Sequence, residues 1–229
     1  MAVPAGALRF NSDSGKLEYY NGEVWWQIDN FSADNATGGA RGVYAGGDPG
    51  GGINVIEFVN IDSTGNATDF GDMITSREVG ASNSSITRGL FAGGRNPTLK
   101  NEIEYVTISS TGNALDFGDL IGAVWGPASL ASPTRGIWAG GIDPNATNVI
   151  NYVTIPSKGN AQDFGDLTVA KGRNAGMSNS TRGVIGLEGL NTMDYITIAT
   201  TGNAQDFGDM MRTISGVRGA CSDSHGGLG

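Results

Sequence analysis

The residues best suited to chemistry lie in a ten-residue phrase that the chain contains four times. It reads TGNATDFGDM from Thr64, TGNALDFGDL from Thr111, KGNAQDFGDL from Lys158 and TGNAQDFGDM from Thr201. Each copy carries two aspartates around a Phe-Gly pair, and carboxylate oxygens are the ligands that calcium prefers. The phrase also contains the Asp-Phe-Gly of protein kinases, but the glycine-rich loop, strand lysine and catalytic-loop aspartate of a kinase are missing from the chain.

The fourfold copying favours a structural role for this phrase. A catalytic loop is normally needed once, whereas a structural unit is what gets copied. Calcium also needs several oxygen ligands in one shell, and a short expected strand separates the two aspartates of each copy. We therefore predict that the Asn and Asp side chains close turns and that the second aspartate pairs with an arginine.

Four arginines recur at intervals of 47 residues, each followed by glycine. They are Arg41, Arg88, Arg135 and Arg182, and they match in number the second aspartates Asp72, Asp119, Asp166 and Asp209. This equality predicts one Arg–Asp contact per repeat, which would fix strand order or the junction between repeats. The alternative is a ring of four arginines around a channel that binds an anion.

Other candidates for catalysis or metal binding are few. His225 is the only histidine and lies in a glycine-rich terminal stretch, which is a poor place for a rigid Ser-His-Asp triad. Cys221 is the only cysteine, which rules out an intrachain disulfide and the usual zinc spacings. The unrepeated Glu23, Glu78 and Glu188 would suit a glycan hydrolase or lyase only if they converged, and nothing in the sequence places them together. We predict no catalytic residue, no metal and no cofactor.

Composition narrows the classes of partner. The chain of 229 residues has a net charge of −9 and no basic run, so we do not expect it to bind nucleic acid. No apolar stretch approaches 18 residues, so we do not expect membrane insertion. The start, MAVPAGALRF, lacks the pattern of a signal peptide, so we expect synthesis in a cytoplasm.

The elements that carry these residues are predicted to be strands. Four units run from about residue 38 to about residue 225, and no segment shows sustained helical periodicity. Each unit reads as a strand from Arg-Gly to a Gly pair, a β-branched strand such as IEYVTI, the DFGD strand, and a small polar strand. The small polar strands are VGASNS, GPASLAS, NAGMSNS and RGACSDS. The predicted fold class is all-β, with a four-repeat domain over residues 38–229.

The second strand of each unit indicates how the sheets are arranged. Ile103 and Tyr105 lie on one face of this strand, and Val106 and Ile108 lie on the other. A surface sheet would alternate apolar and polar residues, so this sheet needs a neighbour on each side. Stacking repeated four-stranded sheets around an axis provides those neighbours and gives a β-propeller.

The repeats resemble kelch blades, in which a Gly pair is followed by an aromatic residue. The matching residues are Gly46-Gly47 with Phe58, Gly93-Gly94 with Tyr105, and Gly140-Gly141 with Tyr152. The later kelch tryptophan is replaced by Phe70, Phe117, Phe164 and Phe207, which we expect to take its packing role. Because kelch propellers usually have more than four blades, the ring is either small, or the repeats form an open or multi-chain assembly.

Residues 1–37 lie outside the repeat pattern and are predicted to form a β-ribbon. GALRFNSDSGKLEYYNGEVWWQI, residues 6–28, reads as two or three strands with turns at SDSG and YNGE. Its aromatic residues are too apolar to remain uncovered, so they pack on the repeat domain or on copies of themselves. We therefore assign attachment or oligomerisation to Phe10, Tyr19, Tyr20, Trp25 and Trp26.

This ribbon resembles a short module of tailed-bacteriophage virion proteins, particularly fibre and baseplate-associated proteins. The matching residues are Gly6, Arg9, Phe10, Asn11, Glu18, Tyr20, Asn21, Gly22 and Trp25. The STGNAxDFGDL-type repeats are likewise similar to those of predicted structural proteins of marine phages, including cyanophages. The resemblance implies a non-enzymatic virion component, such as a tail fibre, adhesin or capsid decoration, that forms a homo-oligomer, with a trimer favoured. Its implied partners are other virion proteins and a host-surface glycan.

Two other function classes remain open. A free lectin-like propeller would bind sugars through exposed aromatic residues, for which Trp125 and Trp138 are the candidates, although Trp138 fits better as a core residue. A glycan-active enzyme is the third and weakest reading.

Overall fold

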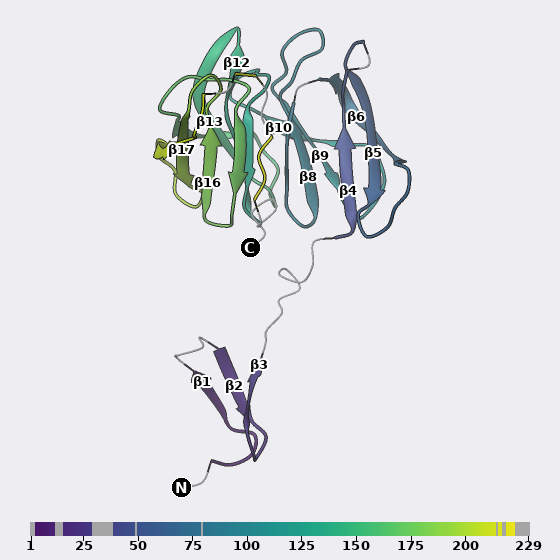
Figure 1. The fold of residues 1–229 in the computed structure, drawn as a ribbon. Coiled ribbons are helices and arrows are strands. Elements are labelled where there is room, and N and C mark those ends of the chain that lie inside the picture. Colours follow the sequence, from purple (N-terminus) through teal and green to yellow (C-terminus); the bar gives the residue numbers. More distant parts are fainter. Residues whose placement is uncertain are drawn as a thin grey trace. The chain divides into compact units, whose positions relative to one another are not determined.

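The computed structural model describes residues 3–11, 16–28, 39–48, 50–78, 80–213, 215–216 and 219–222. The chain divides into two compact units, Met1–Thr37 and Gly38–Gly229. The described residues form 18 strands in five antiparallel sheets and contain no helix (Figure 1). The prediction of an all-β protein is therefore confirmed. The sequence explains it: β-branched and aromatic runs are separated by Gly, Asn, Asp and Ser turns.

The N-terminal unit is one three-stranded sheet, in which β2 lies between β1 and β3. Its strands are β1 (Leu8–Asn11), β2 (Lys16–Tyr20) and β3 (Trp25–Ile28). The turn between β2 and β3 is closed by Asn21, whose Oδ1 accepts the backbone N–H groups of Glu23 (2.9 Å) and Val24 (2.8 Å). Gly22 follows with φ of +107°, a backbone conformation that favours glycine. The Asn-Gly pair thus fixes the register of this hairpin.

The repeat unit contains four sheets, called the first to fourth repeat sheets. The first comprises β4 (Arg41–Ala45), β5 (Ile53–Asn60) and β6 (Thr68–Arg77). The second comprises β7 (Ala81–Ser84), β8 (Arg88–Ala92), β9 (Glu102–Thr107) and β10 (Leu115–Asp119). The third comprises β11 (Ala128–Ala131), β12 (Arg135–Asp143), β13 (Asn145–Thr154) and β14 (Gln162–Asp166). The fourth comprises β15 (Ala175–Ser178), β16 (Arg182–Gly186), β17 (Thr192–Thr197) and β18 (Gln205–Asp209).

The small polar strand begins a sheet and does not end one, which shifts the predicted repeat boundary. β7 pairs with β8, with Ser84 opposite Gly89. The connection is a tight turn in which Ser85 Oγ accepts the N–H groups of Thr87 and Arg88. As a consequence, the first repeat sheet has three strands, and the last copy of the small polar segment follows the fourth sheet. Residues 219–222 of that segment are described.

Each DFGD strand carries a β-bulge at its Phe-Gly pair. In the second sheet the pairing register shifts between Asp116 and Gly118, and the same shift occurs in the other three sheets. Gly118 has φ of +146°, which side-chain-bearing residues rarely adopt. Backbone geometry thus accounts for the Phe-Gly pair in every copy, because the bulge needs a glycine at this position.

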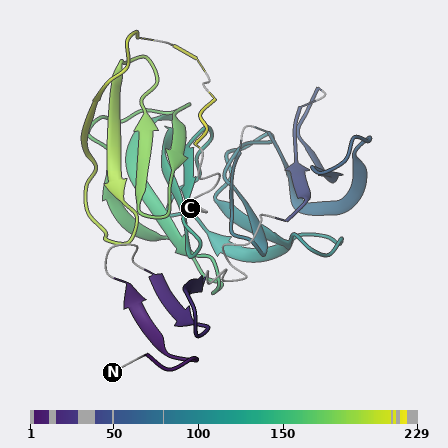
Figure 2. The same cartoon turned by 60° about the horizontal axis from the view of Figure 1, so that its bottom comes forward.

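Each cluster of the hydrophobic core lies between two successive repeat sheets. On β9, Ile103 and Tyr105 belong to the cluster shared with the third sheet, whereas Val106 belongs to the cluster shared with the first. Their exposed fractions are 0, 8 and 2%. The prediction that this strand has apolar residues on both faces, each covered by a neighbouring sheet, is confirmed. The first sheet (blue) and the fourth (green) lie at opposite sides of the repeat unit in both views (Figures 1 and 2).

Candidate functional site

The repeated residues meet where one repeat sheet contacts the next, a contact that we call the sheet joint. Between the second and third sheets, the Gly-Asn turn before β14 hydrogen-bonds to the DFGD strand β10. Gly159 N donates to Phe117 O (2.9 Å), Ala161 N donates to Asp119 O (2.7 Å), and Asp119 N donates to Asn160 Oδ1 (3.1 Å). The other two joints contain the equivalent bonds, from Gly112 to Phe70, Ala114 to Asp72, Asp72 to Asn113, Gly202 to Phe164, Ala204 to Asp166 and Asp166 to Asn203. The repeated phrase therefore links one sheet to the next.

Close packing explains why the joint needs glycine on both sides. A Cβ placed on Gly118 would lie 2.5 Å from the carbonyl carbon of Gly159, and one placed on Gly165 would lie 2.5 Å from that of Gly202. No real Cβ contact is that short, so a side chain here would push the sheets apart. The DFGD glycine thus serves both the bulge and the joint.

The first aspartate of the phrase bonds to the bulge glycine in two copies. Asp163 Oδ1 accepts the N–H of Gly165 (3.1 Å), and Asp206 Oδ1 accepts that of Gly208 (3.0 Å). Both bonds lie within strands β14 and β18, so these aspartates support the bulge where the sequence predicted that they close a turn. Within the described ranges, no three or more His, Cys, Asp or Glu side chains gather as a group that could hold a metal ion. His225, which was considered for a triad, lies outside the described residues.

Three of the four repeated arginines bind the next sheet through backbone carbonyls. Nη1 donates to a main-chain oxygen in three copies, from Arg41 to Ile108 (2.8 Å), from Arg88 to Ile155 (2.7 Å) and from Arg135 to Ile198 (2.7 Å). Each guanidinium also lies over an aromatic ring of its own sheet, at 4.6 Å from Phe58, 5.0 Å from Tyr105, 4.7 Å from Tyr152 and 4.8 Å from Tyr195. These arginines are therefore joint residues that act by cation–π contact and charge-assisted hydrogen bonds.

The predicted Arg–Asp pair within each repeat is wrong. Among the described residues, no ion pair within 4.0 Å joins Arg41, Arg88, Arg135 or Arg182 to Asp72, Asp119, Asp166 or Asp209. The reason is strand register: in the second sheet Arg88 lies opposite Thr107, whereas Asp119 lies opposite Glu102. Five residues along β9 separate the two ends by ~17 Å. Asp72, Asp119 and Asp166 serve the joints through their backbone N–H and C=O groups.

A second set of joint residues is missing from the sequence predictions. The middle residue of each second strand is polar. In three sheets it is buried and accepts hydrogen bonds from the residues just after the DFGD sequence of the preceding sheet. Asp194 accepts Thr168 N (2.8 Å) and Thr168 Oγ1 (2.7 Å), and Asn151 accepts Ile121 N (2.9 Å). The available signal was a polar residue in every copy of an otherwise apolar strand, as in IEY, INY and MDY.

Glu104 is the most heavily used of these acceptors. It is 1% exposed and accepts Ile74 N (2.7 Å), Thr75 N (3.1 Å) and Thr75 Oγ1 (2.6 Å). It also forms an ion pair with the buried Arg77, which donates in addition to the carbonyls of Gly93 and Glu102. Because both charges are removed from water, each depends on the other for compensation.

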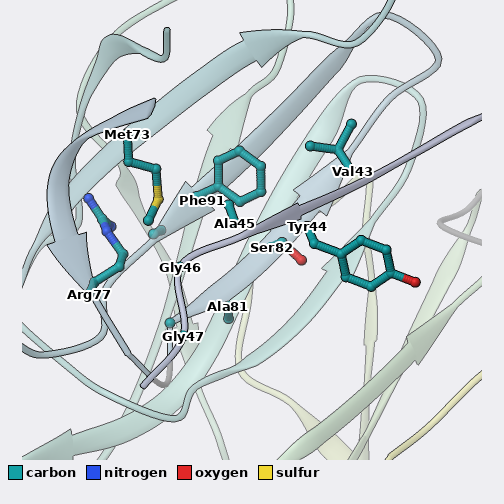
Figure 3. Close-up of a pocket in the computed structure, with 12 residues that line it drawn as sticks. Val43, Tyr44, Ala45, Gly46, Gly47, Met73, Arg77, Ala81, Ser82 and Phe91 are labelled. Atoms are coloured by element: carbon teal, nitrogen blue, oxygen red, sulfur yellow. The ribbon is translucent and has the colours of Figure 1, made fainter. Parts of the chain in front are cut away.

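A cavity of about 280 Å³ lies along the edge of β4 in the first repeat sheet (Figure 3). The β4 side is formed by residues 43–47, and the side chains of Met73 and Phe91 face the cavity next to that strand. In the other three sheets the equivalent edge is covered by β7, β11 or β15. The cavity therefore lies where the first sheet lacks the small polar strand that covers this edge in the other three sheets.

The predicted attachment residues divide between the two faces of the N-terminal sheet. Phe10, Tyr19 and Trp26 share one face, where they are 67, 40 and 59% exposed. Tyr20 and Trp25 lie on the other face with their ring centroids 5.1 Å apart. Strand alternation produces this division. The first face is an open apolar surface.

The second face of the N-terminal sheet has a polar network. Arg9 Nε and Asn11 Nδ2 donate to the buried Glu18 carboxylate at 2.7 and 2.8 Å, and the Arg9 guanidinium lies 4.2 Å from the Trp25 ring centroid. The hydrogen bonds from Asn11 and then Arg9 lower the pKa of Glu18 below its ordinary value of 4.5. Arg9, Asn11, Glu18 and Trp25 thus serve to hold this sheet together.

Trp138 and Trp125 differ in their surroundings, and the unrepeated Glu78 and Glu188 pair with the two arginines beside Trp125. Trp138 is fully buried in the core, as predicted. Trp125 has Arg95 and Arg173 at 4.9 and 5.9 Å from its ring centroid. Glu78 pairs with Arg95 (2.6 Å) and Glu188 with Arg173 (3.5 Å), while Glu23 belongs to the N-terminal unit. The two unrepeated glutamates of the repeat unit, Glu78 and Glu188, are therefore paired with arginines.

Comparison with protein-family models and with curated protein sequences finds no match. No helix long and apolar enough to cross a membrane occurs in the part of the chain that the structure describes.

Proposed function

We propose that this protein is a non-enzymatic structural component of a tailed-bacteriophage virion. One observation carries the proposal: the residues that looked chemical, in the DFGD phrase and the repeated arginines, are used to join one sheet to the next. A protein whose most repeated polar groups hold sheets together is built as a scaffold. The resemblance of the N-terminal sheet and of the repeats to phage structural proteins is the reason for assigning this scaffold to a virion.

The repeat unit is, in this proposal, an open kelch-like propeller segment. Four sheets packed face to face, with each core cluster at a joint, support this arrangement. The loops at the sheet ends are displayed on a rigid scaffold, as binding loops commonly are. The segment acts as a fibre head, adhesin or capsid decoration, and its loops contact other virion proteins or a host-surface glycan.

The N-terminal sheet attaches the chain to the virion or to its own copies, with a homotrimer favoured. Its open apolar face, with Phe10, Tyr19 and Trp26, is the surface for this contact. Tyr20 and Trp25 support that surface from the opposite face through the Arg9 and Glu18 network. Multiple copies would multiply weak contacts through effective concentration.

The test is incorporation into virions of the phage that encodes this sequence. Mass spectrometry of purified particles should detect this chain, and Trp26→Asp should lower its copy number at least tenfold. Leu115→Asp is the matched control, because Leu115 is similarly exposed (55 against 59%) but lies on β10 of the repeat unit. Absence of the chain from purified virions would overturn the proposal, and glycan binding by the isolated chain would then favour the lectin alternative.

A further inference from the structure

The outer face of the first repeat sheet carries one half of a sheet joint without the other half. Its Gly-Asn turn comprises Gly65, Asn66 and Ala67, which are exposed, whereas the equivalent Ala114 and Ala204 are 4 and 8% exposed. In the described part of the chain, no hydrogen bond joins this turn to a DFGD strand. The turn therefore repeats the Gly-Asn-Ala sequence of the joint turns, but no DFGD strand in the described part of the chain lies against it.

Two further positions on the same face are also exposed where their equivalents in the inner joints are buried. Ile61 is 63% exposed, whereas the equivalent Ile155 and Ile198 are each 1% exposed. Glu57 is exposed, although it occupies the strand position at which Glu104 and Asp194 are buried acceptors. The apolar contact and the acidic acceptor of the joint are thus both exposed on this face.

The outer face of the fourth repeat sheet carries the complementary half. Phe207 is 46% exposed, whereas Phe70, Phe117 and Phe164 are each 2% exposed. Gly208 has φ of +127°, as the joint glycines do, yet a Cβ placed on it would meet nothing within 4 Å. Met211, two residues after Asp209, is fully exposed. This DFGD strand has the joint conformation without the joint.

The arginine of the fourth sheet shows the same difference. Arg182 lies over Tyr195 at 4.8 Å, as its counterparts lie over their own rings. Within the described residues it donates no hydrogen bond to a carbonyl of a following sheet, whereas Arg41, Arg88 and Arg135 each do. The carbonyl that would match theirs by sequence position is that of Ile61.

The small polar strands β7, β11 and β15 each lie at one edge of a repeat sheet. The hydrogen bonds that connect them continue beyond the fourth sheet. Ser178 Oγ donates to Ala131 O (2.8 Å), which connects β15 to β11, and Ser222 Oγ donates to Ser178 O (2.7 Å) in the same way. Residues 220–222 thus lie where the small polar strand of a further repeat would lie, although the described chain has no fifth repeat sheet after them. The first sheet lacks such a strand at the edge of β4, where Tyr44 is 66% exposed and the cavity of Figure 3 lies.

We propose that these two faces bind each other between copies of the chain, with the fourth sheet of one copy joined to the first sheet of the next. The occupant is a second copy because the same joint forms three times within the chain and each end displays the missing partner of the other. In this joint Arg182 donates to Ile61 O, Met211 N donates to Glu57, and Phe207 and Gly208 receive the Gly65–Ala67 turn. Residues 220–222 pair along β4, and Tyr44 enters the core as Phe91 and Trp138 do.

Such a contact is head-to-tail, since it uses two different surfaces. Head-to-tail contacts close into rings when the rotation permits and otherwise extend into filaments. The inference goes beyond the proposed function and does not depend on it, because it concerns how copies associate wherever the protein works. It is also separate from attachment through the N-terminal sheet.

The test uses two single variants of the full chain, each with one face spoiled. Ile61→Asp places a charge on the first-sheet face, and Phe207→Asp places one on the fourth-sheet face. Light scattering after size exclusion should show a concentration-dependent increase in mass for the wild type. Each variant alone should lose that increase, and an equimolar mixture should regain one joint, because the intact face of each variant meets the intact face of the other.

Circular dichroism controls for folding, since both side chains are exposed, and Leu115→Asp on β10 should leave the wild-type mass unchanged. Association through the N-terminal sheet alone would give the same mass for the wild type, both variants and their mixture, and this result would overturn the proposal. A wild type that stays monomeric at high concentration would also overturn it. Neither result bears on whether the chain is found in virions.

Discussion

The inner joints and the two end faces contain the same residues in different surroundings. Phe164 and Phe207 both belong to the phrase AQDFGD, yet their exposed fractions are 2 and 46%. Glu104 is buried among four donors, whereas its counterpart Glu57 is exposed. The comparison teaches that a joint residue is buried by the neighbouring sheet and not by its own. The repeated chain therefore supplies matched controls for its own interactions.

The largest expected difference in the free energy of unfolding is between variants of Glu104 on β9 and of Glu57 at the same repeat position on β5. Glu104→Ala leaves Arg77 buried without its counter-charge, and breaking such a pair costs about 3–5 kcal/mol. Glu57→Ala removes an exposed carboxylate and should change the free energy of unfolding by less than about 0.5 kcal/mol. Urea unfolding at a dilution where the chain is monomeric measures both values.

Equal effects of these two substitutions would contradict the distinction between inner joints and end faces. A double variant, Glu104→Gln with Arg77→Met, sharpens the test, because replacing both charges by similar-sized neutral groups removes the uncompensated charge. It should recover much of the stability lost in Glu104→Ala.

Substitution of an inner-joint arginine should also destabilise the chain more than substitution of the end-face arginine, but by a smaller amount. Arg135→Ala and Arg182→Ala both remove a cation–π contact, with Tyr152 and Tyr195 respectively. Only Arg135→Ala also removes a charge-assisted hydrogen bond to Ile198 O, so it should destabilise the chain by about 1.5–3 kcal/mol more. Thermal or urea unfolding of dilute protein compares the pair. A larger effect from Arg182 under those conditions would be inconsistent with an unpartnered end face.

The smallest expected effect is a loss of stability in acid that Glu18 causes in the N-terminal sheet and not in the repeat unit. The folded pKa of Glu18 is lowered, so in acid the unfolded chain binds this proton first and the folded sheet resists it. The resulting stabilisation is complete above the ordinary pKa of 4.5 and is lost as pH falls through the lowered value. NMR signals of β1–β3 should therefore change in that range.

Glu18→Gln provides the control for this titration, since it keeps the shape of the side chain and removes its charge. The acid-dependent change in β1–β3 should disappear in this variant, while the signals of the repeat sheets should titrate as in the wild type. If the N-terminal signals of both proteins responded to acid alike, Glu18 would not be the group responsible.

The sequence was sufficient to predict features that depend on one strand and its immediate neighbours. The apolar faces of β9 required covering sheets, and Tyr105 and Val106 are buried as expected. The Asn-Gly turn after β2 and the core position of Trp138 were also readable, because each follows from local chemistry.

Features that cross from one repeat to the next were not predictable. Arg41 binds Ile108, 67 residues away, and a perfect repeat places an equivalent partner in every unit. Equal spacing therefore cannot distinguish a contact within a unit from one with the next unit. The same ambiguity misassigned the small polar strand to the preceding sheet. Glu104 was missed because an acidic residue on a strand normally indicates a face exposed to solvent.

The offset between the sequence unit and the sheet has a consequence for how such a chain changes in evolution. Every inner joint uses the same backbone atoms and an arginine at the same repeat position. A gene duplication or deletion of one whole unit would therefore add or remove one sheet and keep the backbone hydrogen bonds of each joint. The buried acceptor would still need adjustment, because Arg77 requires a glutamate such as Glu104 in the following sheet whereas the next joint uses Asn151.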